Sequence, residues 1–266
     1  MQNTTPIPTT TNIAGKDKPS PIALITGASQ RIGKAITEKL HDMGYCVIIH
    51  FHKNEQAAQN LATHLNQQRT NSAITLQANL KQAEDIAKLA KMALAHWGKL
   101  DLLVNNASAF EADITTEPQS TIQWQDIIDI NLRAAWLLSN TLKTSLAKHQ
   151  GCIINMVDIY AERPLKSYSI YSISKAGIAM LCKSLALEFA PDIRVNGISP
   201  GAILWPDIQE ESTETQLAHQ QAILNKIPLA KLGSTKAITE AVQFLIHCDY
   251  ISGQVISVDG GRSINI

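Results

Sequence analysis

A regular alternation of short apolar runs with longer segments of helical periodicity constrains the fold of this sequence most strongly. From residue 21 onward, strands are predicted at 22–25, 46–51, 73–77, 100–104, 152–157, 193–198 and 254–258, and helices at 31–43, 55–68, 82–97, 122–148, 168–190, 209–225 and 236–247. Strands that alternate with helices of this length form βαβ units, whose right-handed crossovers place helices on both faces of a parallel sheet. We therefore predict an α/β fold with a doubly wound sheet.

The size and the charge balance of the chain limit its class of function. Its 266 residues, 45% of them hydrophobic, suit one large domain over 21–266, preceded by a mobile Thr-, Pro- and Asn-rich tail over 1–20. Lys plus Arg and Asp plus Glu number 23 each, which argues against a nucleic-acid or membrane-surface partner.

The cysteines and the apolar runs bear on the location of the protein. The tail has no apolar segment typical of a secretory signal, and no apolar run is long enough to span a bilayer. Four scattered cysteines without a C-x-x-C pair are typical of reduced thiols, so we predict a cytoplasmic protein without a metal site.

A loop with two glycines directly follows the first predicted strand, with the sequence Thr26-Gly-Ala-Ser-Gln-Arg-Ile-Gly33. A strand before it and a helix after it form the context that a dinucleotide-binding loop requires. Gly27 permits a tight turn, Gly33 allows close packing of helix and strand, and the helix N-terminus points N–H groups at a pyrophosphate. Arg31 replaces the usual middle glycine. It is either a ligand for a phosphate or an anionic substrate edge, or a surface side chain on the first helical turn.

The end of the second predicted strand indicates the choice of cofactor. NAD-binding folds usually carry an acidic residue there, which bonds the ribose 2′-hydroxyl. This chain has His52, Lys53 and Asn54 instead, which offer donors and positive charge to the 2′-phosphate of NADP(H). The alternative interpretation is an ordinary polar loop.

Tyr171 and Lys175 form a Tyr-x-x-x-Lys pair, which places both side chains on one face of the long predicted helix. A free tyrosine has a pKa near ~10 and is a poor acid at neutral pH. An adjacent ammonium is expected to lower that pKa, and it can also hold the nicotinamide ribose. The alternative is a surface tyrosine beside a solvated lysine.

Taken together, these motifs resemble the short-chain dehydrogenase/reductase family in order and spacing. The resemblance runs from Pro21 to the C-terminus and rests on the glycine loop, Asn105-Asn106-Ala107, the Tyr171/Lys175 pair, Pro200-Gly201 and the terminal Val258-Asp-Gly-Gly261. It implies a single Rossmann-type domain with about seven parallel strands, often assembled as a tetramer with the last strand near a subunit interface. It also implies that Asn131 holds a water molecule in a proton relay to Lys175.

The resemblance implies a set of contacts with NADPH. They are Gly27, Arg31, Ile32, Gly33, His52, Lys53, Asn54, Asn79, Leu80, Asn106, Ala107, Ser108, Tyr171, Lys175, Pro200 and Gly201. Asn79 stands where an aspartate often bonds adenine in this family, so the contacts with adenine are expected to differ.

Asp158 departs from the pattern of most family members, which have a serine at this point to bond a substrate carbonyl. A carboxylate beside a reacting ketone oxygen opposes the negative charge that develops there. A carboxylic acid, however, can deliver a proton to a ring nitrogen, and burial beside a cofactor raises its pKa and favours that role. Pteridine reductases share this aspartate. The alternative for Asp158 is a helix- or loop-capping role.

Further features resemble the pteridine reductases, among them Arg31, the segments 52–54 and 106–110, and Tyr168-Ser-Ile-Tyr171. The resemblance implies reduction of a pterin, dihydropterin or dihydrofolate ring. The implied substrate contacts are Arg31, Ser108, Phe110, Asp158, Tyr171 and Trp205. Phe110 is expected to stack on the pterin, unless it is a core aromatic. The competing hypotheses are an NADPH-dependent carbonyl or 3-oxoacyl reductase and a non-catalytic NADPH-binding sensor.

Overall fold

The computed structural model describes residues 20–203 and 214–265 and contains one parallel sheet of seven strands. The strands are β1 (Ile22–Ile25), β2 (Cys46–Phe51), β3 (Ala73–Gln77), β4 (Leu102–Asn105), β5 (Cys152–Met156), β6 (Arg194–Pro200) and β7 (Val255–Val258). Their spatial order is β3-β2-β1-β4-β5-β6-β7, and all six pairings are parallel. The predicted doubly wound α/β fold is confirmed.

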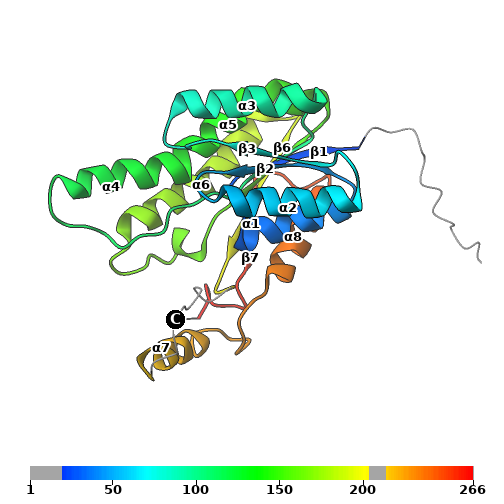
Figure 1. Cartoon of the computed structure of the whole chain (residues 1–266). Helices are drawn as coiled ribbons and strands as arrows, with labels where there is room; N and C mark the ends of the chain where they lie inside the picture. Colours follow the sequence, from blue (N-terminus) through cyan, green and yellow to red (C-terminus); the bar gives the residue numbers. More distant parts are fainter. Residues whose placement is uncertain (1–19, 204–213, 266) are drawn as a thin grey trace, which may run out of the picture.

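Helices cover both faces of this sheet (Figure 1). The helices are α1 (Arg31–Asp42), α2 (Glu55–Gln68), α3 (Ala83–Trp97), α4 (Gln119–Ile128), α5 (Ala134–Lys148), α6 (Ser169–Phe189), α7 (Glu214–Leu224) and α8 (Thr235–His247), with a π-helical turn η1 (Asp129–Arg133) and a 3-10 turn η2 (Ile159–Ala161). In Figure 1, α1, α2 and α8 lie below the sheet, and α3 and α5 lie above it. Helix α6 shares the apolar core of α3 and α5 and so belongs to the same face.

Two apolar cores result, one on each face of the sheet. The strands are buried on both sides, so they are continuously apolar instead of alternating, as expected for a parallel sheet. Ile22, Leu24 and Ile48 face the core under α3, α5 and α6, whereas Ile25 and Ile49 face the core over α1, α2 and α8.

The order of the strands reverses between β1 and β4, and polar side chains tie these two strands together. The Thr26 hydroxyl accepts hydrogen bonds from the backbone N–H groups of Asn106 and Ala107, at 2.9 and 3.0 Å. The Asn106 side-chain amide donates in return to the carbonyls of Thr26 and Gly27, at 2.9 and 3.0 Å. In open α/β sheets, ligands bind at this reversal, outside the carboxyl ends of the strands.

Helix α6 is the only described helix long and apolar enough to cross a membrane by length and composition. More than half of its apolar window is buried inside the fold, where it packs on β5 and β6. It is therefore a core helix. A helix covered by a sheet on one side and by neighbouring helices on another is apolar on most of its surface, which accounts for the composition of α6.

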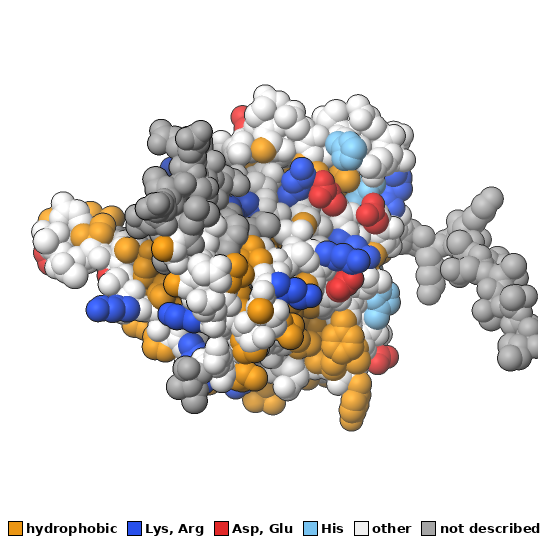
Figure 2. All heavy atoms as spheres, turned by 90° about the horizontal axis from the view of Figure 1, so that it is seen from below, with side chains coloured by type: hydrophobic (Ala, Val, Ile, Leu, Met, Phe, Trp, Pro, Cys, Tyr) orange, Lys and Arg blue, Asp and Glu red, His pale blue; other side chains and the backbone are white. Residues whose placement is uncertain are grey.

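Most predicted elements lie within two residues of their structural bounds, but the predicted helix at 122–148 differs. It begins earlier, at Gln119, and the π-helical turn η1 interrupts it at Asn131. For the helix predicted at 209–225, the structure describes α7, and residues 209–213 lie outside the described part. The tail predicted at 1–20 lies outside it as well, apart from Ser20. The surface seen from below carries hydrophobic side chains among scattered charged ones (Figure 2).

Candidate active site

A groove of about 460 Å³ lies at the carboxyl ends of β1, β2 and β4. Twelve of the sixteen predicted cofactor contacts line it, namely Gly27, Arg31, Ile32, Gly33, His52, Lys53, Asn54, Asn79, Leu80, Asn106, Ala107 and Ser108. The volume is typical of sites for small molecules and cofactors. The structure thus brings together four segments that are widely separated in sequence.

The glycine loop fits a dinucleotide because its two glycines leave no room for a side chain. Gly27 has φ 61°, in the left-handed region that favours glycine. A Cβ on Gly33 would lie 2.1 Å from the carbonyl oxygen of Gly27 and 2.6 Å from the side-chain nitrogen of Asn106. The first turn of α1 therefore packs directly on the loop, and its N-terminal N–H groups are available to an anion in the groove.

Arg31 has φ 52°, so it holds a left-handed conformation at the position where the family has glycine. For a side chain other than glycine, this conformation costs of order 1–2 kcal/mol. Strain of this kind is concentrated at ligand-binding sites. Arg31 lines the groove and is exposed, which favours the ligand-binding interpretation over that of an ordinary surface side chain.

The polar residues after β2 lie at the rim of the same groove. His52, Lys53 and Asn54 are exposed, and no acidic side chain lies among the described residues that line the groove. Asn54 also caps α2 by accepting from the N–H of Ala57 at 3.3 Å. On the other wall, the Asn79 side chain accepts from the N–H of Lys81 at 3.2 Å, which holds the turn after β3.

Asp158 and Tyr171 are in direct contact. The Tyr171 hydroxyl donates to Asp158 Oδ2 at 2.8 Å, and Asp158 Oδ1 accepts from the N–H of Tyr160 at 3.0 Å. Asp158 thus caps η2 with one oxygen, as one interpretation predicted, while the other oxygen faces the phenol. Burial raises the pKa of Asp158 above its ordinary value, and the charge of Lys175 offsets only part of that rise.

Tyr171 and Lys175 are 4% and 3% exposed, so the interpretation as a surface pair is wrong. The expected lowering of the Tyr171 pKa is also wrong for the protein alone: burial raises it, and the adjacent charge of Asp158 raises it further. The Lys175 ammonium donates to the Met156 carbonyl at 2.9 Å and lies over the Tyr171 ring, 5.5 Å from its centre. Burial lowers the pKa of Lys175 to about 8.

Asn131 lies in the π-helical turn and is 3% exposed. Its side chain accepts from the N–H of Ala109 at 2.7 Å and donates to the carbonyl of Ala109 and to the Ser174 hydroxyl, both at 3.0 Å. It therefore anchors the loop that carries Ser108 and Phe110. Its predicted role in a water relay stays a prediction.

Phe110 is 52% exposed, so it is not a core aromatic. Its ring is stacked on Tyr168, with centroids 4.6 Å apart and planes at 12°, and it meets Tyr171 edge-on at 4.7 Å. These three rings form an aromatic wall beside the Asp158 carboxyl, in which Phe110 is exposed, Tyr168 is half-buried and Tyr171 is buried. Such a wall suits a flat, apolar-faced ligand.

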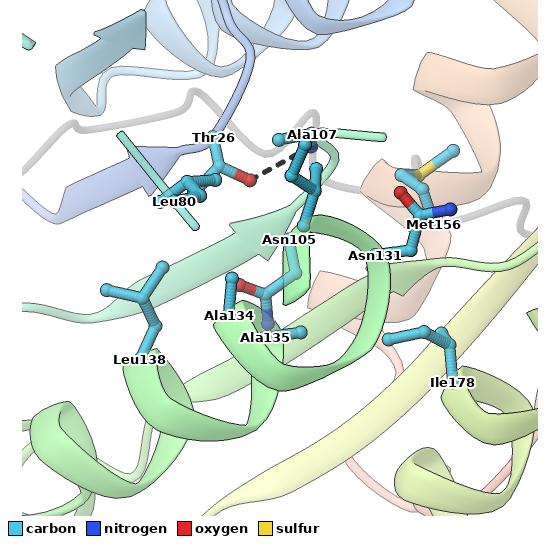
Figure 3. A pocket seen from close by; sticks show the side chains of 11 residues that line it. Thr26, Leu80, Asn105, Ala107, Asn131, Ala134, Ala135, Leu138, Met156 and Ile178 are labelled. Atoms are coloured by element: carbon cyan, nitrogen blue, oxygen red, sulfur yellow. Dashed lines mark hydrogen bonds between the residues drawn. The ribbon is translucent and has the colours of Figure 1, made fainter. Parts of the chain in front are cut away.

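A small cavity of about 10 Å³ lies behind the groove (Figure 3). Asn105 reaches from the end of β4 toward Ala134 and Ala135 on α5, while the hydroxyl of Thr26 faces Ala107. The Asn105 side chain donates to Asn155 Oδ1 at 2.8 Å, and its own oxygen has no hydrogen-bond partner among the described residues. The volume suffices for about one water molecule.

Four of the sixteen predicted cofactor contacts do not line the groove, namely Tyr171, Lys175, Pro200 and Gly201. Pro200 and Gly201 lie at the end of β6, on the same edge of the sheet, where Gly201 packs against Asp259. Trp205 lies outside the described residues. Within the described part of the chain, no group of three or more His, Cys, Asp or Glu side chains is placed to hold a metal ion.

Arg262 is a site residue that the sequence interpretation missed. Its Nη2 donates to the Tyr160 hydroxyl at 3.0 Å, and its guanidinium carbon lies 5.6 Å from the centre of that ring. Its charge lowers the pKa of Asp158, against the larger effect of burial. The terminal Asp-Gly-Gly motif directly precedes it, but no signal in the sequence indicated the contact with Tyr160, 102 residues away.

Comparison with known proteins identifies the family. The family described as "Enoyl-(Acyl carrier protein) reductase" matches residues 27–263. The chain belongs to the short-chain dehydrogenase/reductase family. It is therefore an oxidoreductase, and members of this family use NAD(P)(H).

Three relatives of this short-chain dehydrogenase/reductase carry different names. Pteridine reductase 1 of Leishmania tarentolae is 32% identical over 286 residues, which cover 92% of this chain and 97% of that protein. Glucose 1-dehydrogenase 2 of Bacillus subtilis is 30% identical, covering 94% and 97%. A 3-oxoacyl-[acyl-carrier-protein] reductase of Staphylococcus aureus is 31% identical, covering 90% and 96%. Because these identities are similar, they do not distinguish among the substrate classes, and the residues of the site must do so.

The strain at Arg31 makes a substitution there informative in two ways. We expect Arg31→Gly to leave the free energy of unfolding within about 1 kcal/mol of the wild type, because relief of strain offsets the greater freedom of the unfolded chain. We expect it to weaken binding of the reduced cofactor about tenfold, because a charged hydrogen-bond donor is lost. Urea unfolding and titration of cofactor fluorescence measure the two effects.

Lys34→Ala, one position beyond the loop on the exposed face of α1, is the matched control and should change neither quantity. Wild-type cofactor affinity in Arg31→Gly would show that the guanidinium does not contact the cofactor.

Proposed function

We propose that this protein is an NADPH-dependent pteridine reductase, which reduces a C=N bond in the ring of a pterin, dihydropterin or dihydrofolate. The contact between Asp158 and the Tyr171 hydroxyl carries this proposal. A partly buried carboxyl group with a raised pKa is suited to give a proton to a ring nitrogen and unsuited to stabilise an oxyanion. The name of the relative from Leishmania tarentolae supports the same substrate class.

In the proposed mechanism, the site residues bind the cofactor and supply the proton. The reduced nicotinamide, when bound, supplies the hydride that the ring carbon accepts. Asp158 gives its proton to the ring nitrogen, so that C=N becomes CH–NH, and solvent returns a proton to Asp158 after the step. The Tyr171 hydroxyl, which donates to Asp158 Oδ2, stabilises the carboxylate in the meantime. Lys175, 3% exposed, would hold the nicotinamide ribose and keep a positive charge near the carboxylate that Asp158 leaves behind.

Two further features support the proposed ligands. His52 and Lys53 lie exposed at the groove rim without an acidic neighbour among the described lining residues, which favours the 2′-phosphate of NADPH over the bare ribose of NADH. The exposed ring of Phe110, stacked on the half-buried Tyr168, offers a flat surface on which a pterin ring would stack. Arg31 and Ser108, which line the groove, complete the set of proposed substrate contacts on the described residues.

A carbonyl or 3-oxoacyl reductase is the second candidate, and the similarity to the Staphylococcus aureus enzyme favours it. It requires Asp158 to be tolerated beside a carbonyl oxygen. A non-catalytic NADPH-binding sensor is the third candidate. The buried arrangement of Tyr171, Lys175 and Asp158 weighs against it, because binding alone requires no proton donors.

The deciding experiment is an absorbance assay of NADPH oxidation with dihydrobiopterin, dihydrofolate or a simple 3-oxoacyl ester, each with and without methotrexate. We expect oxidation with the pteridines, inhibited by methotrexate, and slower oxidation when NADH replaces NADPH. Oxidation with the ester alone would establish the carbonyl reductase. NADPH binding without turnover of any substrate would establish the sensor.

The raised pKa of Asp158 predicts the pH dependence of pteridine reduction. An acid must be protonated to act, so activity should fall as the pH rises through the pKa of Asp158. Asp158→Asn and Asp158→Ser should lower kcat about 100-fold or more, within the usual contribution of a general acid. Unchanged turnover of the pteridine in either variant would contradict this role.

Arg262 provides the matched test of the electrostatics. Because its charge lowers the pKa of Asp158, Arg262→Gln should move the alkaline limb of the pH profile to higher pH. Arg262→Lys keeps the charge and should leave the limb in place. A limb that stays fixed in both variants would mean that Asp158 is not the group that titrates.

We also propose that the enzyme is a homotetramer located in the cytoplasm. Ile173, Met180 and Leu187, which are 50%, 59% and 85% exposed, share one face of α6 because they are spaced by seven residues. A second exposed apolar surface includes Phe244 on α8 and Tyr250 before β7, the last strand of the sheet. Two separate self-complementary surfaces produce a tetramer rather than a dimer.

Light scattering of the purified protein measures its assembly. We expect a tetramer for the wild type and a dimer for Leu187→Glu, because a charge on the α6 surface removes only that interface. A monomeric wild-type protein would contradict the proposal. Fractionation of cells that express the native chain tests the proposed location.

A further inference from the structure

His50 is a buried histidine between the two walls of the cofactor groove. It lies on β2, next to the last residue of that strand, and is 2% exposed. The N–H of Gly27 donates to its Nδ1 at 3.1 Å, and its Nε2 lies 3.2 Å from the carbonyl oxygen of Ala78. One ring therefore connects the glycine loop after β1 with the segment after β3.

The partners of the ring fix its tautomer. A backbone N–H can only donate, so Nδ1 must be the acceptor for Gly27. The proton then resides on Nε2, which donates to the carbonyl of Ala78. Burial lowers the pKa of His50 to about 4, in agreement with a neutral ring at physiological pH. A doubly protonated ring would bring two N–H groups against each other and break the bond to Gly27.

The backbone of His50 adds a second bond to the same loop, since its carbonyl accepts from the N–H of Ala28 at 2.9 Å. Gly27 has φ 61° and needs restraint, because glycine is free to adopt many other conformations. On the opposite wall, Ala78 directly precedes Asn79 and Leu80, which line the groove. A shift of either segment would change the width of the groove.

We propose that His50 is a positioning residue for the nucleotide cofactor, which holds the phosphate-binding loop in place through its bond to Gly27, while its bond to Ala78 fixes the orientation of the ring. The inference rests on the use of NAD(P)(H) by the family and not on pterin reduction. His50 itself touches no reacting atom.

Two substitutions separate the two hydrogen bonds. His50→Asn places an amide oxygen near the position of Nδ1 and can keep the bond to Gly27. His50→Gln places an amide nitrogen near the position of Nε2 and can keep the bond to Ala78. His50→Leu removes both bonds. Titration of NADPH fluorescence, without any substrate, gives Kd for each protein.

We expect Kd to rise about tenfold or more in His50→Leu and His50→Gln and to stay within about threefold of the wild type in His50→Asn, because the Gly27 bond holds the phosphate loop. With a substrate that the enzyme turns over, kcat at saturating NADPH should stay unchanged in all three. Wild-type Kd in His50→Leu, or equal loss in His50→Asn and His50→Leu, would overturn the proposal.

His41 provides the matched control. It is another buried histidine, 5% exposed, whose Nε2 lies 2.8 Å from the Ser72 hydroxyl, away from the groove. His41→Leu should lower the melting temperature without changing Kd for NADPH. An equal rise of Kd in this variant would show that the effect of His50 is one of general stability, which also overturns the proposal. Neither result depends on which substrate the enzyme reduces.

Discussion

The bonds between Thr26 and Asn106 hold β1 and β4 together at the point where the order of the strands reverses, and the rest of the site depends on them. The side chain of each residue forms hydrogen bonds with backbone groups of the loop that carries the other residue, so the two loops keep a fixed separation. Gly33 closely approaches the loop held in this way because it has no Cβ, which would lie 2.1 Å from the Gly27 carbonyl oxygen. The groove lies at this junction, lined by residues of both loops.

The sequence was sufficient to predict those parts of the site that lie in contiguous loops at the carboxyl ends of strands. In a parallel sheet these ends meet at one edge, so Gly27, His52, Asn79 and Asn106 had to converge. His50 was missed because an apolar strand gives no indication of which side chain reaches a neighbouring loop. Arg262 was missed because its partner is remote in the sequence. The pKa of Tyr171 depends on burial and on the orientation of Asp158, which no spacing of residues specifies.

Asp158 combines two roles, the capping of η2 and the contact with the Tyr171 hydroxyl. One oxygen caps η2 and the other accepts from Tyr171, so a single carboxyl group both shapes the site and bears its proposed chemistry. A serine at this position would have to make both contacts through a single oxygen on a shorter side chain. The aspartate therefore changes the local backbone anchoring as well as the acidity of the site, and the two effects are inseparable in any exchange between these residues.

Helix α6 carries Tyr171 and Lys175 toward the sheet and an uncovered apolar stripe, marked by Leu187, toward the outside. Helix α6 thus lies between the site and, in the proposed assembly, a second copy of the chain. A contact that shifts or stabilises this helix therefore also affects the position of Tyr171 and Lys175. For an enzyme assembled in this way, dilution separates the subunits, and specific activity falls as the protein concentration falls.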